Sequence, residues 1–528
     1  MPLILHRQSL FLAVACWVAL CAPAWAAADL VLTNGHVYTA DAQSRWAEAV
    51  AVKGGKIIYV GSTAGARAKR GPNTKEIDLA GRLLLPGLFD THNHTDGRAE
   101  IMNWVQLGGQ YTTHTLDTYR RIISEYRASH PGIKQLRGAG FDGEILPAIG
   151  RSQKRQPREL LDDIVSDIPA YIESWTGHQA WVNTKALELA GINKDTPNPP
   201  GVQAGIEHDP ATGEPNGILY EAGAQNLVIF KMPESEMTVT QYHEGLLSFQ
   251  RDVAAPRGIT GILIPTAKPA ENFDMALQQL SDEGQMTLHV SAAQWADEAR
   301  GVEQIPELVA GRARFHGGRY FKFNVIKILA PWKQDELNET VAALDKNGFQ
   351  VYVHQTGPTS NYASVLDAFD YALKQNGARD SRHTITHMRA ASAPLAARFK
   401  ALNVRADADW NNAKDWWTAP KAFIEAEVPL TLSSDYPIFE ASPLAKIAEC
   451  VKHGIPLEAL IDSVTIRGAE LEFIEKETGS ITADKAADLI VLDKDLFKVA
   501  AQEIPSAKVL LTLFAGQELY RDSSLQVR

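Results

Sequence analysis

The chain has 528 residues, of which 45% are hydrophobic and 22% charged, and its formal net charge is -11 at pH 7. This length suggests two or three domains, or one large barrel with an accessory domain, and the composition is ordinary for a soluble globular protein. The negative charge leads us to expect no nucleic-acid partner, because nothing basic would offset phosphate repulsion.

Residues 1–26 have the pattern of a secretory signal peptide. Arg7 lies in a short, weakly basic leader, residues 10–20 form an apolar run, and Ala24 and Ala26 supply small residues for cleavage. The alternative is a membrane anchor, but the run is shorter than the roughly 20 residues that cross a bilayer. We therefore expect an exported, periplasmic protein without stable membrane insertion.

Three cysteines are present, Cys16, Cys21 and Cys450. Two of them would leave with the signal peptide, so the mature chain could form no internal disulfide. The count also excludes a zinc site built from cysteines.

Both ends of the mature chain show short β-like stretches separated by turns. The turn signals Asn34–Gly35 and Gly54–Gly55 each predict a hairpin, and similar strand patterns return near the C-terminus. We expect residues 27–82 and 470–528 to form one small β-sandwich domain from both termini.

The middle of the chain, residues 83–469, alternates apolar strands with helical patterns. Eight such strand–helix units predict an α/β fold, a (β/α)₈ TIM barrel, and mostly apolar runs fit parallel strands that are buried on both faces. The seventh strand is the least apolar, since it carries Arg405 and Asp407. The expected strands are 83–90, 259–264, 287–291, 323–329, 350–354, 383–387, 404–408 and 429–434.

A large insertion, residues 97–255, separates the first two barrel strands. An insertion after a barrel strand lies at the C-terminal face, where the active sites of these barrels form. We interpret it as a cap over the site, with an independent appendage as the alternative. Its aromatic residues include Trp104, Phe141, Trp175 and Trp181.

The first barrel strand ends in His92-Asn93-His94. Residues i and i+2 of a strand point the same way, so both imidazoles can reach one ion from one side. Neutral imidazole is the commonest metal ligand among side chains. The position at a strand end therefore makes this pair a candidate metal site.

Three further strands end in polar residues, His354, His387 and Asp435. In a barrel these ends converge, and one or two divalent ions would satisfy the four histidines and the carboxylate together. The alternative is that some histidines face loops or bond to backbone in the core. On the fourth strand Lys327 lies nearer the expected metals, and Lys322 is the competing lysine.

This order of residues resembles the amidohydrolase superfamily. Finer features resemble its family 3 branch, which includes N-substituted formamide deformylases, and the resemblance covers nearly all of residues 29–521. Shortly after the lysine this branch usually carries an Asp-Gly pair, whereas residues 328–332 here read Ile-Leu-Ala-Pro-Trp. The segments that carry the resemblance are Gly140-Phe141-Asp142, 177–187, 212–221 and 479–492.

The resemblance implies a role for each position. It implies that His92 and His94 hold the more buried ion, that His354 and His387 hold a second, and that Zn²⁺ is the expected metal. Lys327 would be carboxylated by CO₂ and bridge the two ions. Asp435 would bind the first ion and act as the general base or proton shuttle.

We expect a hydrolase that cleaves a non-peptide C–N bond, of the amide or formamide kind, by metal-activated hydroxide. His178 and Trp332 are candidates for binding a small-molecule substrate, although His178 is equally interpreted as a histidine packed beside aromatics. Lactone or ester hydrolysis and deamination stay open on the same metal site. A non-catalytic periplasmic binding protein and a homo-oligomeric state also stay open.

Overall fold

The computed structural model describes residues 27–108, 113–199, 205–233, 237–266, 271–356, 359–409 and 416–526. The expected signal peptide, residues 1–26, lies outside these ranges. Among the described helices, none is long and apolar enough to cross a membrane.

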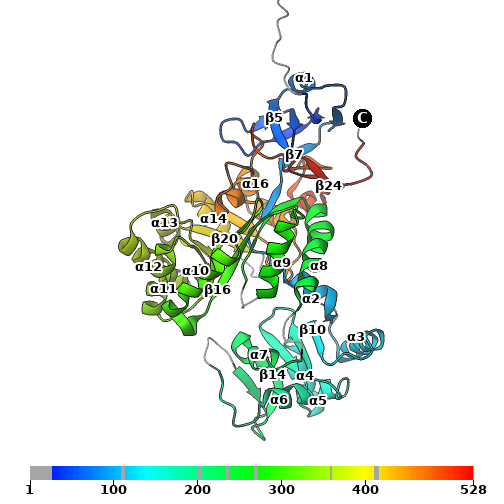
Figure 1. Ribbon diagram of the computed structural model, residues 1–528, viewed down its shortest axis with the longest axis vertical. Coiled ribbons are helices and arrows are strands. Elements are labelled where there is room, and N and C mark those ends of the chain that lie inside the picture. Colours follow the sequence, from blue (N-terminus) through cyan, green and yellow to red (C-terminus); the bar gives the residue numbers. More distant parts are fainter. Residues whose placement is uncertain are drawn as a thin grey trace, which may run out of the picture.

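A parallel eight-stranded sheet curves into the barrel that the sequence predicts (Figure 1). Each strand pairs in parallel with the next along the chain, in the order β21-β20-β19-β18-β17-β16-β15-β8. All eight strands were predicted in the right order. Their bounds are β8 Leu88–Asp90, β15 Ile259–Ile264, β16 His289–Ala296, β17 Phe321–Leu329, β18 Gln350–His354, β19 Thr384–Thr386, β20 Arg405–Asp409 and β21 Leu430–Ser433.

The first and last strands meet just beyond their C-terminal ends. The Asp435 amide donates to the His92 carbonyl at 2.8 Å, and the His94 amide donates to the Tyr436 carbonyl at 2.7 Å. Below them the buried Asp90 carboxylate accepts the Ser434 amide at 2.7 Å. These bonds nearly close the barrel and bring two distant segments of the chain together.

Helices cover the outside of the barrel and bury one apolar face against it, as in other (β/α)₈ barrels. The main core includes Val341 and Leu344 from a helix together with Ile326, Val351 and Val353 from strands. The helices are α8 Val239–Ser248, α9 Glu271–Asp282, α10 Ile305–Arg314, α11 Gln334–Lys346, α12 Thr359–Asn376, α13 Ala393–Ala401, α14 Thr418–Glu425, α15 Pro443–Lys452, α16 Leu457–Ser463 and α17 Ile466–Leu471, with short turns of other helix types at η1 Phe249–Ala254, η2 Ala255–Arg257, η3 Glu298–Gln304 and η4 Ala501–Ser506.

Two mixed sheets lie at one end of the barrel, the first formed by N-terminal strands alone and the second by strands from both termini. The sheets share one core, in which Leu32 and Val50 of the first meet Leu84, Leu489 and Leu511 of the second. The first sheet has the order β5-β4-β1-β6 and the second β24-β23-β22-β7-β2-β3. The bounds are β1 Leu30–Thr33, β2 His36–Tyr38, β3 Trp46–Ala47, β4 Ala49–Lys53, β5 Lys56–Gly61, β6 Lys75–Asp78, β7 Leu83–Pro86, β22 Leu489–Leu492, β23 Val509–Phe514 and β24 Gln517–Arg521, and helix α1 spans Thr63–Arg67.

Two local expectations at the N-terminus need correction. The Asn34–Gly35 hairpin is wrong, because β1 and β2 belong to different sheets. Asn34 does make a left-handed turn at φ 55°, but burial in two separate sheets decides which strands pair. The expected first barrel strand, 83–90, is divided at Gly87 into β7 and β8. The Gly54–Gly55 hairpin is confirmed, since it joins the antiparallel strands β4 and β5.

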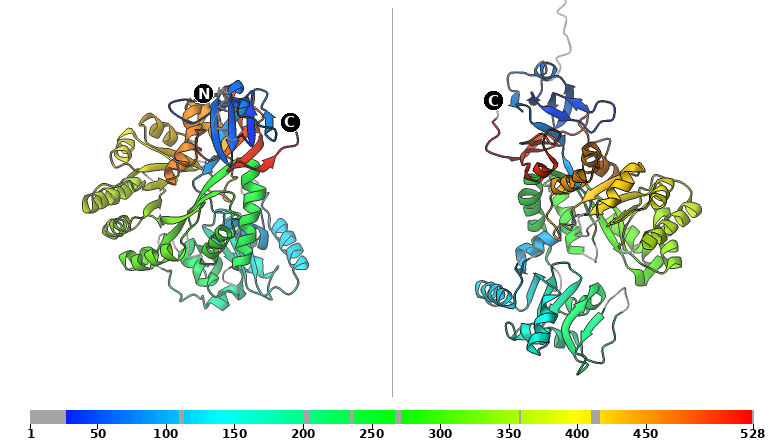
Figure 2. Two further views of the ribbon diagram at one scale, coloured as in Figure 1. Left: turned by 45° about the horizontal axis from the view of Figure 1, so that its top comes forward. Right: turned by 180° about the vertical axis from the view of Figure 1, so that it is seen from behind.

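The insertion folds as a separate α/β unit at the end of the barrel opposite the terminal sheets (Figure 1; Figure 2, right). Its sheet has the order β13-β14-β12-β11-β10-β9. Phe141 and Trp181 are fully buried in its core, and the Trp181 indole donates to the Pro157 carbonyl at 2.7 Å. The bounds are α2 Gly97–Asn103, β9 Val105–Gln106, α3 Leu116–Ser129, β10 Leu136–Phe141, α4 Ile145–Gln153, α5 Pro157–Asp162, β11 Ala170–Ser174, β12 Gln179–Val182, α6 Thr184–Ala190, β13 Gly205–His208, β14 Pro215–Tyr220 and α7 Glu221–Ile229.

Candidate metal centre

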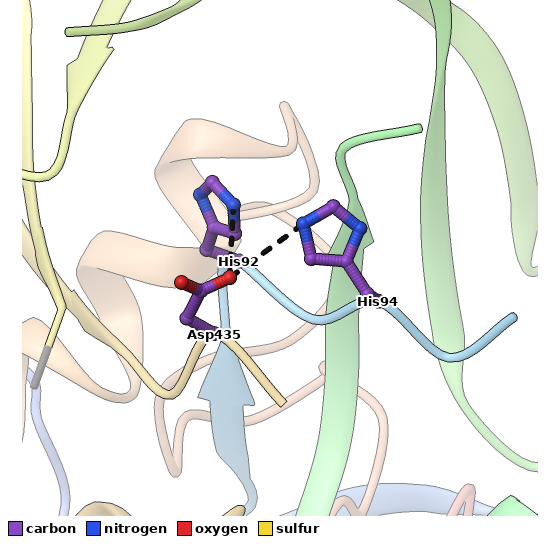
Figure 3. Close-up of side chains that lie close together, drawn as sticks. All are labelled: His92, His94 and Asp435. Atoms are coloured by element: carbon purple, nitrogen blue, oxygen red, sulfur yellow. Dashed lines mark ion pairs between the residues drawn. The ribbon is translucent and has the colours of Figure 1, made fainter. Parts of the chain in front are cut away.

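Closure of the barrel places His92, His94 and Asp435 around one point (Figure 3). The Asp435 Oδ1 atom lies 3.5 Å from His92 Nε2 and 3.6 Å from His94 Nε2. Asp435 has a left-handed backbone at φ 57°, which is uncommon outside glycine and often marks functional sites. Two ring nitrogens and a carboxylate oxygen at these separations fit a single divalent ion.

A second group lies beside the first and shares Asp435. It adds His387 and Asp409, and the His387 Nδ1 atom lies 2.8 Å from Asp409 Oδ2. The His354 ring packs on His387 with centroids 4.2 Å apart. Within the described residues, His387 Nε2 and Asp409 Oδ1 are buried without a hydrogen-bond partner, which is the condition expected of atoms that face a cation.

Burial favours the neutral, metal-binding form of two imidazoles of this centre, His92 and His354. Desolvation lowers the pKa of His92 and of His354 well below the usual histidine value. Lys327 adds to the effect on His92, and His387 adds to the effect on His354. Neutral imidazoles with free ring nitrogens are ready ligands.

Lys327 lies inside this cluster, whereas Lys322 does not. The Lys327 Nζ atom lies 3.4 Å from His92 Nε2. Burial lowers the pKa of Lys327 to about 7, although the carboxylates of Asp435, Asp407 and Asp409 oppose the effect. Lys322 instead donates to the carbonyls of Glu472 and Phe473, so Lys327 is the lysine that the geometry associates with the metal centre.

His178 approaches the centre from the insertion, between β11 and β12. Its Nδ1 atom lies 3.2 Å from Glu221 Oε2, and this hydrogen bond raises the pKa of His178. The Asp435 carboxylate raises it further, and the His178 charge helps to lower the pKa of His354. The His178 side chain is exposed and within electrostatic range of the centre, which suits a contact with substrate.

Trp332 lies apart from this cluster, in the barrel core. It is only 8% exposed, and its indole nitrogen donates to the Leu329 carbonyl at 2.8 Å. Its role in substrate binding stays a prediction.

The sequence reasoning missed Asp407 and Asp409 as parts of the site. Both lie on β20, the strand whose polar residues made it the least convincing of the eight. The alternation Asp407-Ala408-Asp409 was the available signal, because residues i and i+2 of a barrel strand share a face. Both carboxylates are fully buried beneath the histidines.

The chain is similar to known proteins over most of its length. A family model described as "Amidohydrolase family" matches residues 75–520. An N-substituted formamide deformylase from Arthrobacter pascens is 27% identical over 543 residues, which covers 92% of this chain and 97% of the relative.

Solved structures show the same fold. An uncharacterized metal-dependent hydrolase from Pyrococcus furiosus superposes with a TM-score of 0.65 at 21% identity, covering 88% of this chain and 99% of that one. An adenosine deaminase from Xanthomonas campestris with bound zinc has a TM-score of 0.56 at 12% identity and covers 94% of each chain.

The low pKa of Lys327 predicts a pH-dependent stability of the metal-free protein. In the unfolded chain this lysine titrates near 10.5 and in the folded protein at about 7. Between these values the unfolded state binds more protons, so the free energy of unfolding should rise with pH, by about 1.4 kcal/mol for each unit of pKa shift. Lys327→Met should flatten this rise, measured by denaturant unfolding in CO₂-free buffer with chelator. Lys333→Met, at an exposed lysine, should keep the wild-type slope; equal slopes for all three proteins would refute the prediction.

Proposed function

The chain belongs to amidohydrolase family 3, and from this premise we propose that it hydrolyses a non-peptide C–N bond in a small amide or formamide. The observation that carries the proposal is the convergence of His92, His94 and Asp435 on one point inside the barrel. The named activity of the Arthrobacter relative supports the choice of bond. Lactone or ester hydrolysis, deamination and ligand binding without catalysis are the competing outcomes.

In this proposal the ligands divide between two positions. His92, His94 and Asp435 hold one divalent ion, and His354 and His387 hold a second where two are bound. Zinc is the proposed ion, and the zinc in the adenosine deaminase of the same fold supports it. A bound divalent ion would acidify a water molecule and polarise the substrate carbonyl.

Lys327 is proposed to carry a carboxylate formed with CO₂ and to bridge the two ions. Its side chain is buried, its Nζ atom lies among the imidazoles, and a neutral amine is the form that reacts with CO₂. Conversion of the ammonium to a carbamate would also reverse the sign of its charge, from one that repels a cation to one that binds it.

Asp435 is proposed to move the proton. Its Oδ1 atom lies 3.5 Å from His92 Nε2, and its side chain is 15% exposed while His92 is fully buried, which supports access to both the metal ligands and the substrate. An acid–base group must lie within hydrogen-bond reach of the proton that it transfers. Asp435 would take the proton of the attacking water and deliver it to the leaving nitrogen.

His178 is proposed to bind the substrate from the cap. The Glu221 carboxylate orients its Nδ1 atom and leaves Nε2 for another partner. Glu221 has a left-handed backbone at φ 58°, a conformation that a glutamate rarely adopts without a positional reason. A raised His178 pKa suits hydrogen-bond donation to a substrate oxygen.

Metal binding is the first test. The purified protein should bind one or two divalent ions per chain, measured by elemental analysis and by titration of the metal-free form. Combined His92→Ala and His94→Ala substitutions should abolish binding, because they remove two ligands of one ion. His208→Ala, at a histidine of the cap whose Nδ1 atom contacts the Gly213 carbonyl, should bind normally. Unchanged metal content in the double variant would exclude this site.

Turnover tests the chemistry. Screening the metal-loaded protein with formamides, N-acyl amines, cyclic amides, lactones and aminopurines should give hydrolysis of a C–N bond; turnover of lactones alone would reject the proposed bond.

With such a substrate, Asp435→Asn should lower kcat by about 10²–10⁴-fold, as expected for loss of an acid–base group. Asp484→Asn is the matched control, because Asp484 is an exposed aspartate with φ 70°. Full turnover by metal-loaded Asp435→Asn would remove the assigned role.

Export to the periplasm is also part of the proposal, and it rests on the pattern of residues 1–26 alone. Expression of the full chain in a Gram-negative host should yield a periplasmic protein whose mass corresponds to a start near Ala27. An intact N-terminus in the cytoplasmic fraction would be the contrary result.

A further inference from the structure

The buried Asp407 carboxylate belongs to neither of the two residue groups that could hold a metal ion, but it is linked to His92 through the Thr386 hydroxyl. In the part of the chain that the structure describes, five hydroxyl groups from four barrel segments lie within hydrogen-bond distance of it. An ionised carboxylate only accepts hydrogen bonds, so each hydroxyl directed at it must donate. The hydroxyls belong to Thr91 at 2.8 Å, Tyr352 at 3.1 Å, Thr386 at 2.7 Å, Thr431 at 2.7 Å and Ser433 at 2.8 Å.

Two of these hydroxyls also contact His92. The His92 Nδ1 atom lies 2.9 Å from Thr386 Oγ1 and 3.2 Å from the Tyr352 hydroxyl. A hydroxyl has one proton, and Thr386 has already directed its own to Asp407. The Tyr352 proton is likewise used, on Asp407 or on the Thr91 carbonyl at 2.9 Å. Toward His92 both oxygens can therefore only accept.

We infer that Asp407 is a positioning residue that fixes the tautomer of His92 through Thr386. Because its neighbours only accept, His92 must carry its proton on Nδ1, and Nε2 must present a lone pair to the metal centre. On the opposite side of the ring the Lys327 Nζ atom lies 3.4 Å from Nε2, and its ammonium form would donate to that lone pair. The Asp409 carboxylate contacts the His387 Nδ1 atom directly at 2.8 Å. Two carboxylates of β20 therefore orient two imidazoles of the centre.

This arrangement differs from the common one, in which a carboxylate or carbonyl contacts the metal-binding histidine itself. Here the Asp407 charge acts on His92 through the Thr386 hydroxyl. Hydroxyl groups from four segments of the barrel donate to the same Asp407 carboxylate. The inference rests on the proposed function insofar as His92 is a metal ligand, but the tautomer is a property of the metal-free protein. The two can therefore be tested separately.

The tautomer is tested without metal. Two-bond ¹H–¹⁵N spectra of histidine-labelled, metal-free protein, with His92→Gln to assign the signal, should show His92 protonated on Nδ1. Thr386→Val should shift His92 toward the Nε2-protonated form or a mixture, and Thr386→Ser should restore the wild-type spectrum. A wild-type His92 protonated on Nε2, or a Thr386→Val spectrum identical to wild type, would overturn the inference.

Metal affinity gives the second readout. Thr386→Val should bind Zn²⁺ about 10–100-fold more weakly than wild type, the usual cost of losing a group that orients a ligand, whereas Thr386→Ser should stay close to wild type. Thr431→Val also removes one hydroxyl from Asp407 but does not reach His92. It should lose thermal stability as Thr386→Val does and keep the His92 tautomer.

The outcomes separate the two proposals. Equal affinity losses in Thr386→Ser and Thr386→Val would reject the relay while leaving the metal site intact. A wild-type protein that binds no metal but shows the expected tautomer would reject the proposed function alone. Asp407→Asn should act in the same direction as Thr386→Val, and the Thr386 pair decides the question should that variant fail to fold.

Discussion

The centre depends on the contact that closes the barrel between its first and last strands. Two backbone hydrogen bonds join the segment after β8 to the segment after β21, and they involve His92, His94 and Asp435 themselves. The residues that would bind the proposed ion are therefore also the residues whose backbones hold the two strands together. A rigid backbone at this junction reduces the reorganisation that metal binding would otherwise require.

Beneath this junction the barrel interior is unusually charged. The Asp90 carboxylate on β8 accepts a hydrogen bond from the Ser434 amide. Asp407 accepts hydrogen bonds from five hydroxyl groups, and Asp409 contacts the His387 Nδ1 atom. Burial raises the pKa of Asp90, and the charge of the buried Lys446, whose Nζ atom has no hydrogen-bond partner among the described residues, opposes that shift. The pKa of Asp409 is lowered, mainly by His387 and further by Lys446, against the effect of burial. Buried carboxylates are costly unless cations or donors compensate them, and here hydroxyls, a lysine and the proposed metal share that task.

Much of this could be predicted from the sequence because a barrel strand has a simple pattern. An apolar run that ends in a histidine or aspartate indicates both the strand and the functional end, which located His354, His387 and Asp435. The apolar pattern was weaker on β20, where buried positions carry the polar residues Asp407 and Asp409. The hydroxyl groups that stabilise Asp407 lie on other strands, distant in sequence, so the sequence around β20 does not reveal them. Asn34–Gly35 failed for a related reason: a turn signal fixes the local backbone and leaves the pairing to packing. Trp332 is buried in the barrel core, and its role in substrate binding stays a prediction.

The barrel and the insertion would contribute differently to the proposed activity. The ligands come from strand ends that any member of the fold can retain, so they report the type of chemistry. In the proposed function the insertion would take part in substrate recognition through His178, whose Nδ1 atom lies 3.2 Å from Glu221 Oε2 and whose pKa the Asp435 carboxylate helps to raise. The insertion has its own sheet and core, so its loops can change without disturbing the backbone hydrogen bonds that join the first and last barrel strands. On this proposal, specificity could diverge in the insertion while the proposed metal ligands in the barrel stay fixed.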